Sequence, residues 1–282
     1  FVPSRGLGDV YKRQEELHPN ESHIPAGWGL IGGDNEQGTA ELQVVPAQVW
    51  LDSFIIHTHP VTVAEFALFL EALLASGDAE QAERLVPRWS TGNDTGKALY
   101  HLTPGAVTVR SSTNGTPPID SPIVNVTWEA GRRYAAWLAE QTGLPWRLPT
   151  ELEWERAARG ADGRRFPWGR TLSTRWCRMA ASEPDNSFSS PIDSYPDDVS
   201  VYGVRSLGGN TSDWCLDPIP DVPKVSAEGL GLMPAIDAPA VWRAVRGGSW
   251  SSSPASCRIA RRKGMSVDLT HPSIGIRLVR PL

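Results

Sequence analysis

The segment Arg246-Gly247-Gly248-Ser249-Trp250 could line a pocket, and Cys257 follows its tryptophan by seven residues. Glycine lets a backbone approach other groups closely, because it carries no side chain that would clash. A single thiol beside such a segment can be a packed apolar group, whereas two thiols could clamp a soft metal such as Cu(I). Because one cysteine is present here, the residues favour a packed Cys257.

Nucleophilic catalysis by Cys257 would require a nearby base or a depressed thiol pKa. Arg258, Arg261 and Arg262 follow the cysteine, but no histidine is its sequence neighbour. The sequence therefore favours a buried structural thiol over a nucleophile.

Three glutamates alternate along a short predicted helix, and three arginines stand close to them. The glutamates are Glu151, Glu153 and Glu155, and the arginines are Arg147, Arg156 and Arg159. Charged carboxylates do not enter an apolar core unpaired. We interpret the group as a structural ion-pair network under the tryptophans rather than as a pair of catalytic carboxylates.

Composition and charge limit the class of protein. The 282 residues carry a formal net charge of −5, and 40% of them are hydrophobic. A nucleic-acid-binding protein usually has a basic face, so we expect no nucleic-acid partner. The sequence has no run of about 18 apolar residues, so we expect no membrane partner either.

The three cysteines, Cys177, Cys215 and Cys257, stand far apart and show no zinc-binding spacing. An odd number of cysteines favours reduced thiols and a cytoplasmic location. A disulfide between Cys177 and Cys215 remains open at this point.

The 12 tryptophans, 26 glycines and 24 prolines predict a compact domain with little regular structure. Tryptophan buries a large area and its indole N–H needs a partner, while glycine and proline mark loops. We therefore expect indole-to-backbone hydrogen bonds to hold irregular segments together.

Capping residues predict three helices in the first 160 residues. Thr62 with Glu65 forms a capping box, Thr127 precedes a helix over 128–141 that Gly143 ends, and Thr150 begins a helix that stops at Gly160. Predicted strands are 29–31, 47–54, 201–205, 244–246 and 274–279, and a hairpin is expected within 98–109.

Residues 1–14 (FVPSRGLGDVYKRQ) resemble translated library-adapter sequence. We expect them to be a non-native leader, which leaves one domain over 15–282. A missing upstream domain is a corollary of this interpretation.

Several motifs together resemble the formylglycine-generating enzyme (sulfatase-modifying factor) superfamily. They are 62–70, 146–155 (WRLPTELEWE), 166–169 (FPWG), 209–214 (GNTSDW), 246–250 (RGGSW) and 275–279 (GIRLV). The resemblance covers about residues 25–281. It implies an irregular α+β single domain related to the C-type lectin fold, with few helices, short antiparallel strands and much loop.

The resemblance extends to bacterial non-oxidase members, which are fused to signalling modules such as serine/threonine kinases or are diversified ligand-binding proteins. The family's oxidases convert a protein cysteine to formylglycine with copper held by two thiolates. By position, those thiolates fall on Ser252 and Cys257, and the pocket serine falls on Ser249. Ser256 stands where the oxidases have a tyrosine. A serine hydroxyl does not replace a thiolate toward Cu(I), so copper is not expected and the chain is predicted to be a pseudoenzyme.

The resemblance also implies a calcium site at Ser206, Gly209, Thr211 and Asp213. Calcium prefers about six or more oxygen ligands, several of them charged. Asp213 supplies charge, whereas Ser206 is a weak ligand. Calcium is thus the cofactor expected here, if there is one.

We predict a non-catalytic recognition module that binds a protein, peptide or small ligand through its C-terminal loops. Aromatic and arginine side chains in a shallow pocket suit such recognition. The predicted ligand-binding residues are Trp250, Ser251, Ser252, Ser253, Ser256, Arg258, Arg262 and His271. The alternatives are an oxidoreductase of the formylglycine-generating type with altered metal ligation, and a sensor domain of a kinase-associated protein.

Overall fold

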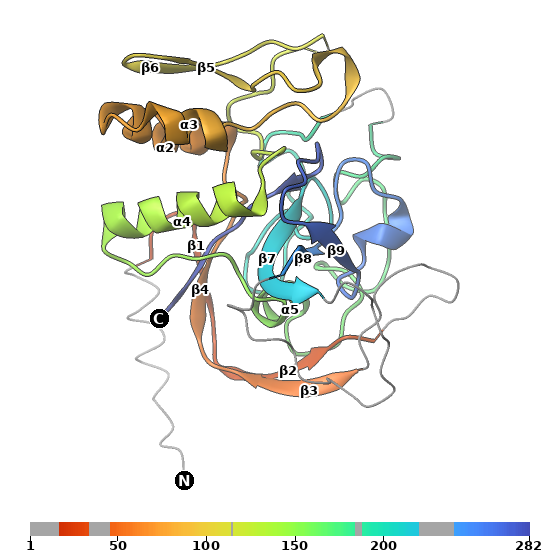
Figure 1. Ribbon diagram of the computed structural model, residues 1–282. Coiled ribbons are helices and arrows are strands. Elements are labelled where there is room, and N and C mark those ends of the chain that lie inside the picture. The colour runs from red at the N-terminus through yellow and green to blue at the C-terminus, as the bar shows by residue number, and fades with distance from the viewer. Residues whose placement is uncertain (1–16, 34–45, 114, 184–187, 220–239) are drawn as a thin grey trace.

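The computed structural model describes residues 17–33, 46–113, 115–183, 188–219 and 240–282 (Figure 1). The predicted leader, 1–14, lies outside these ranges. Within them the chain is α+β, with few helices, short and mostly antiparallel strands and long irregular connections. No helix in the described ranges has the length and apolar character needed to cross a membrane.

The predicted helices begin at their predicted capping residues. They are α2 (Val63–Ala75), α4 (Trp128–Thr142) and α5 (Glu151–Arg159), and a further helix, α3 (Ala79–Leu85), was not predicted. Both capping boxes are present, because the side chains of Thr62 and Thr150 accept from the third amide of their helices and the glutamates reach back. Gly143 ends α4 with φ 70°, a left-handed conformation that favours glycine.

The strands form two small sheets and two hairpins. The strands are β1 (Glu21–Ile24), β2 (Gly27–Ile31), β3 (Ala47–Leu51), β4 (Phe54–His57), β5 (Tyr100–Thr103), β6 (Ala106–Val109), β7 (Ser212–Ile219), β8 (Trp242–Arg246), β9 (Arg262–Ser266), β10 (Ile274–Gly275) and β11 (Val279–Pro281). One sheet has the order β1-β4-β11 and the other β10-β7-β8-β9, in which β10 and β7 are parallel. The hairpins β2–β3 and β5–β6 lie at opposite ends of the molecule (Figure 1).

Three predicted strands differ from the structure. The predicted strand 47–54 is two strands, β3 and β4, because the chain turns between them. The predicted strand 274–279 is likewise divided between β10 and β11, which belong to different sheets. Residues 201–205 form a turn with Gly203 at φ 82°, joined by a single bridge between Val199 and Arg205.

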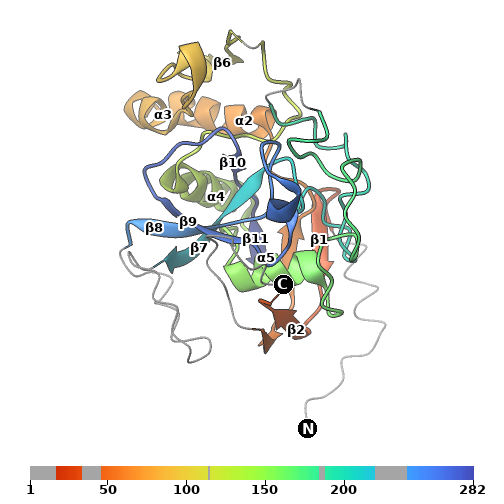
Figure 2. The ribbon, with the colours of Figure 1, turned by 90° about the vertical axis from the view of Figure 1, so that its right-hand side faces the viewer.

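Apolar side chains gather in separate clusters that position the C-terminal loops. The larger cluster joins α2 and α4 to β10, and a second one packs α5 against β4, β7 and β8. A third, small cluster contains Phe166, Cys177, Met179 and Cys257. Figure 2 shows α5 beneath the β7–β8–β9 ribbon, so helix and sheet together support the segments that follow β8.

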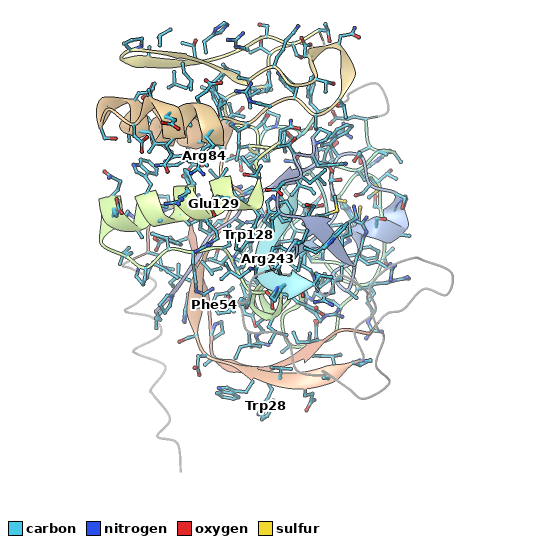
Figure 3. All side chains as sticks on the ribbon, viewed as in Figure 1. Trp28, Phe54, Arg84, Trp128, Glu129 and Arg243 are labelled. Atoms are coloured by element: carbon cyan, nitrogen blue, oxygen red, sulfur yellow. The ribbon has the colours of Figure 1, made fainter. Side chains whose placement is uncertain are left out.

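Indole hydrogen bonds hold the loops, as expected from the tryptophan content. Trp128 donates its indole N–H to the carbonyl of Cys215 at 2.9 Å, and Trp214 donates to that of Val126 at 3.0 Å. The guanidinium of Arg243 lies 4.3 Å from the Trp128 ring, and the two are labelled side by side in Figure 3. These contacts tie α4 to the central sheet.

Candidate functional site

The glycines that follow β8 make room for another backbone segment. Gly247 has φ 84°, and a Cβ on Gly248 would lie 2.2 Å from the carbonyl oxygen of Gly208. The same Cβ would lie 3.0 Å from the Cys257 sulfur. Two loops therefore pack backbone on backbone here, and this packing fixes the residues that come next.

Ser249 and Ser252 bind each other. The Ser249 amide donates to the Ser252 hydroxyl oxygen at 2.9 Å, and the two hydroxyl oxygens lie 3.0 Å apart. Both side chains are buried. The hydroxyl of Ser252 is therefore engaged within its own turn.

Cys257 is fully buried, and Cys177 lies beside it. The two thiols are in hydrogen-bonding contact, and that contact, together with burial, raises the pKa of the Cys177 thiol. All three cysteines are free, and Cys215 belongs to a different cluster, so no Cys177–Cys215 disulfide is present. The thiol pair joins residues eighty positions apart, and no local sequence pattern indicated it.

We define the C-terminal loop face by those predicted ligand-binding residues that reach its surface. Ser251 and Ser253 are exposed, and Trp250, Ser256 and His271 are half-buried. The Trp250 indole N–H donates to the carbonyl of Pro272 at 2.7 Å, which fixes the ring. Burial and the nearby Lys263 lower the pKa of His271.

The two predicted arginines of this site lie elsewhere. Arg258 is 1% exposed, and its Nε donates to the carbonyl of Ala255 at 2.6 Å. Arg262 donates from its Nε to both carboxylate oxygens of Glu151, at 2.7 and 2.8 Å. Arg262 thus belongs to the ion-pair network, and neither arginine side chain joins the C-terminal loop face.

The glutamates of α5 form the expected structural network. Arg147 pairs with Glu153 at 2.6 Å and Arg159 with Glu155 at 2.8 Å, as predicted. Arg156 instead donates to the carbonyls of Trp28 and Gly160.

Arg246 was missed as the centre of this network. It is 2% exposed, and its Nη1 and Nη2 contact Glu151 at 3.2 Å and Glu155 at 2.5 Å. The network therefore ties the end of β8 to α5.

Asp213 is the charged residue of the predicted calcium group, and it is fully buried. One of its oxygens accepts from the Trp154 indole at 2.8 Å and from the Arg277 Nε at 3.1 Å. Its other oxygen, Oδ1, is buried and has no hydrogen-bond partner within the described residues. Burial raises the pKa of Asp213 despite the adjacent guanidinium.

Arg277 shares the surroundings of the predicted calcium ligands. Its guanidinium donates to the carbonyls of Thr58 at 2.8 Å and Arg205 at 2.6 Å, and contacts that of Ser206 at 3.4 Å. A positive charge therefore already stands beside Asp213. The unpartnered Oδ1 still fits an added cation, because a buried carboxylate oxygen without a partner is costly.

A second buried carboxylate, Asp198, was not singled out from the sequence. The amides of Gly208 and Gly209 donate to it at 2.9 Å each. Burial raises its pKa to about 7, although these amides act in the opposite direction. This carboxylate holds the loop that supports Gly248.

The sequence matches the family model "Sulfatase-modifying factor enzyme 1-like domain" over residues 8–282. The chain belongs to this family. It is 28% identical to the serine/threonine-protein kinase pkn1 of Chlamydia caviae, over 96% of this chain and 40% of the kinase. The chain thus spans about two fifths of that relative's length.

Other members of the family cover nearly the whole chain. A formylglycine-generating enzyme of Streptomyces coelicolor is 28% identical over 88% of this chain and 87% of its own. An inactive C-alpha-formylglycine-generating enzyme 2 of Mus musculus is 24% identical over 92% of this chain and 85% of its own.

Solved structures share the fold. PvdO from Pseudomonas aeruginosa superposes with a TM-score of 0.69 at 23% identity and covers 93% of this chain and 94% of its own. Treponema denticola variable protein 1 superposes with a TM-score of 0.65 at 18% identity and covers 93% of this chain and 95% of its own.

The donor set at the family's two thiolate positions does not fit copper in this chain. Ser252 offers a neutral hydroxyl that already accepts from the Ser249 amide. Cys257 directs its thiol toward the carbonyl of Ser253 at 3.5 Å and toward Cys177. A soft metal ion prefers thiolates over a hydroxyl, so these two positions lack the required pair.

Proposed function

We propose that this domain is a non-catalytic recognition module that binds a protein, peptide or small ligand through its C-terminal loop face. One observation carries the proposal. Ser252 stands at a thiolate position with its hydroxyl bound to the Ser249 amide, and the remaining thiol, Cys257, is fully buried. A substrate cysteine would meet hydroxyl groups there instead of an exposed thiolate.

The C-terminal loop face has the chemistry of a binding surface. Ser251 and Ser253 are exposed, and their hydroxyls, which contact those of Ser249 and Ser256, keep acceptor capacity for a ligand. The Trp250 ring is fixed by Pro272, so a ligand would order few side chains on binding.

Two of the relatives support a role outside oxidation, although others are formylglycine-generating enzymes. One is described as inactive, and another is a kinase of which this chain matches two fifths. A sensor domain of a kinase-associated protein is one form that such a module would take, with a signalling domain as its partner.

An aldehyde assay separates recognition from oxidation. The purified domain would be incubated with Cu(I), oxygen and a cysteine-containing sulfatase peptide, with the Streptomyces coelicolor enzyme as positive control. We expect the peptide mass to stay unchanged. Formation of the aldehyde by this domain would refute the proposal.

Binding itself is tested on a peptide array. We expect peptides bound by the domain to be lost in the variant Ser251→Arg, because a long charged side chain would cover the C-terminal loop face. The matched control is Ser111→Arg, an exposed serine near the β5–β6 hairpin. Equal binding by the two variants would place the ligand elsewhere.

The thiol pair favours a second candidate, an oxidoreductase with altered metal ligation. Cys177 would supply the sulfur that Ser252 does not, since it is in contact with Cys257. A Cu(I) titration of the protein and of Cys177→Ser tests this candidate. Stoichiometric binding that the substitution abolishes would favour the oxidoreductase.

We also propose calcium as a structural ligand, held by Asp213 and the carbonyls of Ser206, Gly209 and Thr211. The unpartnered Oδ1 of Asp213 supports it. Excess calcium should then raise the melting temperature relative to a chelator, and Asp213→Asn should remove the difference. No calcium-dependent shift would exclude the site.

A further inference from the structure

A pocket of about 410 Å³ opens between the FPWG segment and the turn at 197–201. Its lining includes Trp168, Trp176, Asp197 and Val201. None of the residues of the C-terminal loop face lines it. The pocket therefore offers a site separate from the one proposed above.

The two indoles form a corner in which Trp168 is held in place. Their ring centroids lie 6.0 Å apart and their planes meet at 72°. Trp168 stacks on Phe166 with a centroid distance of 5.4 Å, and its indole N–H donates to the carbonyl of Thr171 at 2.8 Å. Its orientation is thus set before any ligand arrives.

The absence of a side chain on Gly208 allows the Trp168 ring to occupy this position. A Cβ on Gly208 would lie 2.6 Å from Cζ3 of Trp168, a distance that real side chains do not tolerate. The loop that carries Gly208, whose amide donates to the buried Asp198, therefore packs against the Trp168 ring. The aromatic wall rests on a rigid support.

The charges of the pocket favour a cation. Asp197 is exposed and adds a carboxylate to a lining that contains two electron-rich indole rings. Arg164 also lines the pocket, but its Nε and Nη2 hold both oxygens of Asp162 at 2.9 and 2.7 Å. Its Nη1 donates to the carbonyl of Pro167 at 2.9 Å. The charge of Arg164 is therefore balanced by Asp162, and its N–H groups are engaged, so it is a poor receptor for an anion.

We propose that this pocket binds a small quaternary ammonium compound. Indole faces attract cations, and a tetra-alkylated nitrogen is weakly hydrated and needs no hydrogen-bond acceptor. The exposed Val201 supplies apolar contact for its methyl groups, and Asp197 supplies the opposite charge. A pocket of this volume is within the range of small-molecule sites.

Choline is the probe, and its uncharged carbon isostere dimethylbutanol is the matched control ligand. Both would be titrated into the domain by calorimetry. Cation–π attraction should make choline bind about 3- to 30-fold more tightly than the isostere. Equal affinities, or no choline binding at millimolar concentration, would overturn the proposal.

Two substitutions locate the site. Trp176→Ala should weaken choline binding about tenfold, and Asp197→Asn should weaken it about two- to fivefold because the acid is exposed. The β2–β3 hairpin offers matched controls, since Trp28 and Asp52 are exposed there and Trp28 points away from the body (Figure 3). Trp28→Ala and Asp52→Asn should leave choline affinity unchanged.

The exposed Asp197→Asn variant keeps the test valid if Trp176→Ala fails to fold. Choline affinity that is unaltered in Asp197→Asn, or that falls equally in the two controls, would refute the assigned site. These outcomes leave the C-terminal loop face untouched, because its tests use other residues and ligands.

Discussion

The substitution Trp154→Ala should be among the most damaging single changes in this domain. Trp154 lies on α5 and is fully buried in the apolar cluster that packs this helix against β4, β7 and β8. The Arg246 guanidinium lies 5.5 Å from its ring. Removing the indole would leave a cavity and would take away the hydrogen bond to Asp213. The neighbouring Gly247 cannot fill the space.

The magnitude follows from these two losses. Truncating a buried tryptophan to alanine costs about 3–5 kcal/mol. Asp213 Oδ2 would keep Arg277 as a donor, so the lost indole hydrogen bond adds about 1 kcal/mol, and we expect about 4–6 kcal/mol in all. Since the unfolding free energy of native domains is about 5–15 kcal/mol, the variant should retain little or no net stability.

Urea unfolding followed by far-ultraviolet circular dichroism measures this loss without relying on tryptophan emission. Trp154→Phe should lose about 1–3 kcal/mol, less than Trp154→Ala, because its ring fills most of the indole site while the donor is lost. The exposed Trp28→Ala should lose less than about 1 kcal/mol. A loss under about 1 kcal/mol for Trp154→Ala would refute the reasoning.

Three further changes test the interior. Glu155→Gln should lower the unfolding free energy by about 3–5 kcal/mol, because Arg246 would lose a buried partner; urea unfolding measures it. Burial raises the pKa of Asp198 to about 7 from its usual 3.8, so the native state binds the extra proton and stability should fall as pH rises from about 4 to 7. Asp198→Asn should flatten that part of a plot of melting temperature against pH. Gly248→Ala should lower the melting temperature, since its Cβ would meet the Gly208 carbonyl at 2.2 Å.

The helices could be predicted because their signals are local. A capping residue, a reciprocal glutamate and a terminal glycine lie within about three turns of one another, as at Thr150, Glu153 and Gly160. The strand β7 was missed for the opposite reason. It carries two buried aspartates, Asp213 and Asp217. A buried carboxylate needs hydrogen-bond donors, and here the donors come from Trp154 and Glu151, far away in the sequence.

The candidate site could be predicted only in part. The positions of Ser249, Ser252 and Cys257 follow from one local motif, but Cys177 and Asp198 reach that region from distant segments. Sequence spacing carries no signal for such contacts. Of the predicted arginines, Arg258 is buried against a backbone carbonyl, and the half-buried Arg262 is held by Glu151.

Buried arginines explain how so little regular structure holds a large domain. Irregular loops leave carbonyl groups without strand or helix partners, and such groups need donors when buried. Arg277, fully buried, satisfies the carbonyls of Thr58 and Arg205 while pairing with Asp213. One side chain thereby replaces several ladder hydrogen bonds.

This arrangement has a consequence for the C-terminal loop face. Its backbone is held from inside, by the Trp250 amide on the Asn210 carbonyl at 2.9 Å and by the glycine packing beneath it. The exposed side chains of Ser251 and Ser253 add only hydroxyl contacts to Ser249 and Ser256, at 3.3 and 3.2 Å. Exchanging them for other residues should therefore change what the face binds while leaving the fold intact, which is the property that a recognition module on a constant scaffold requires.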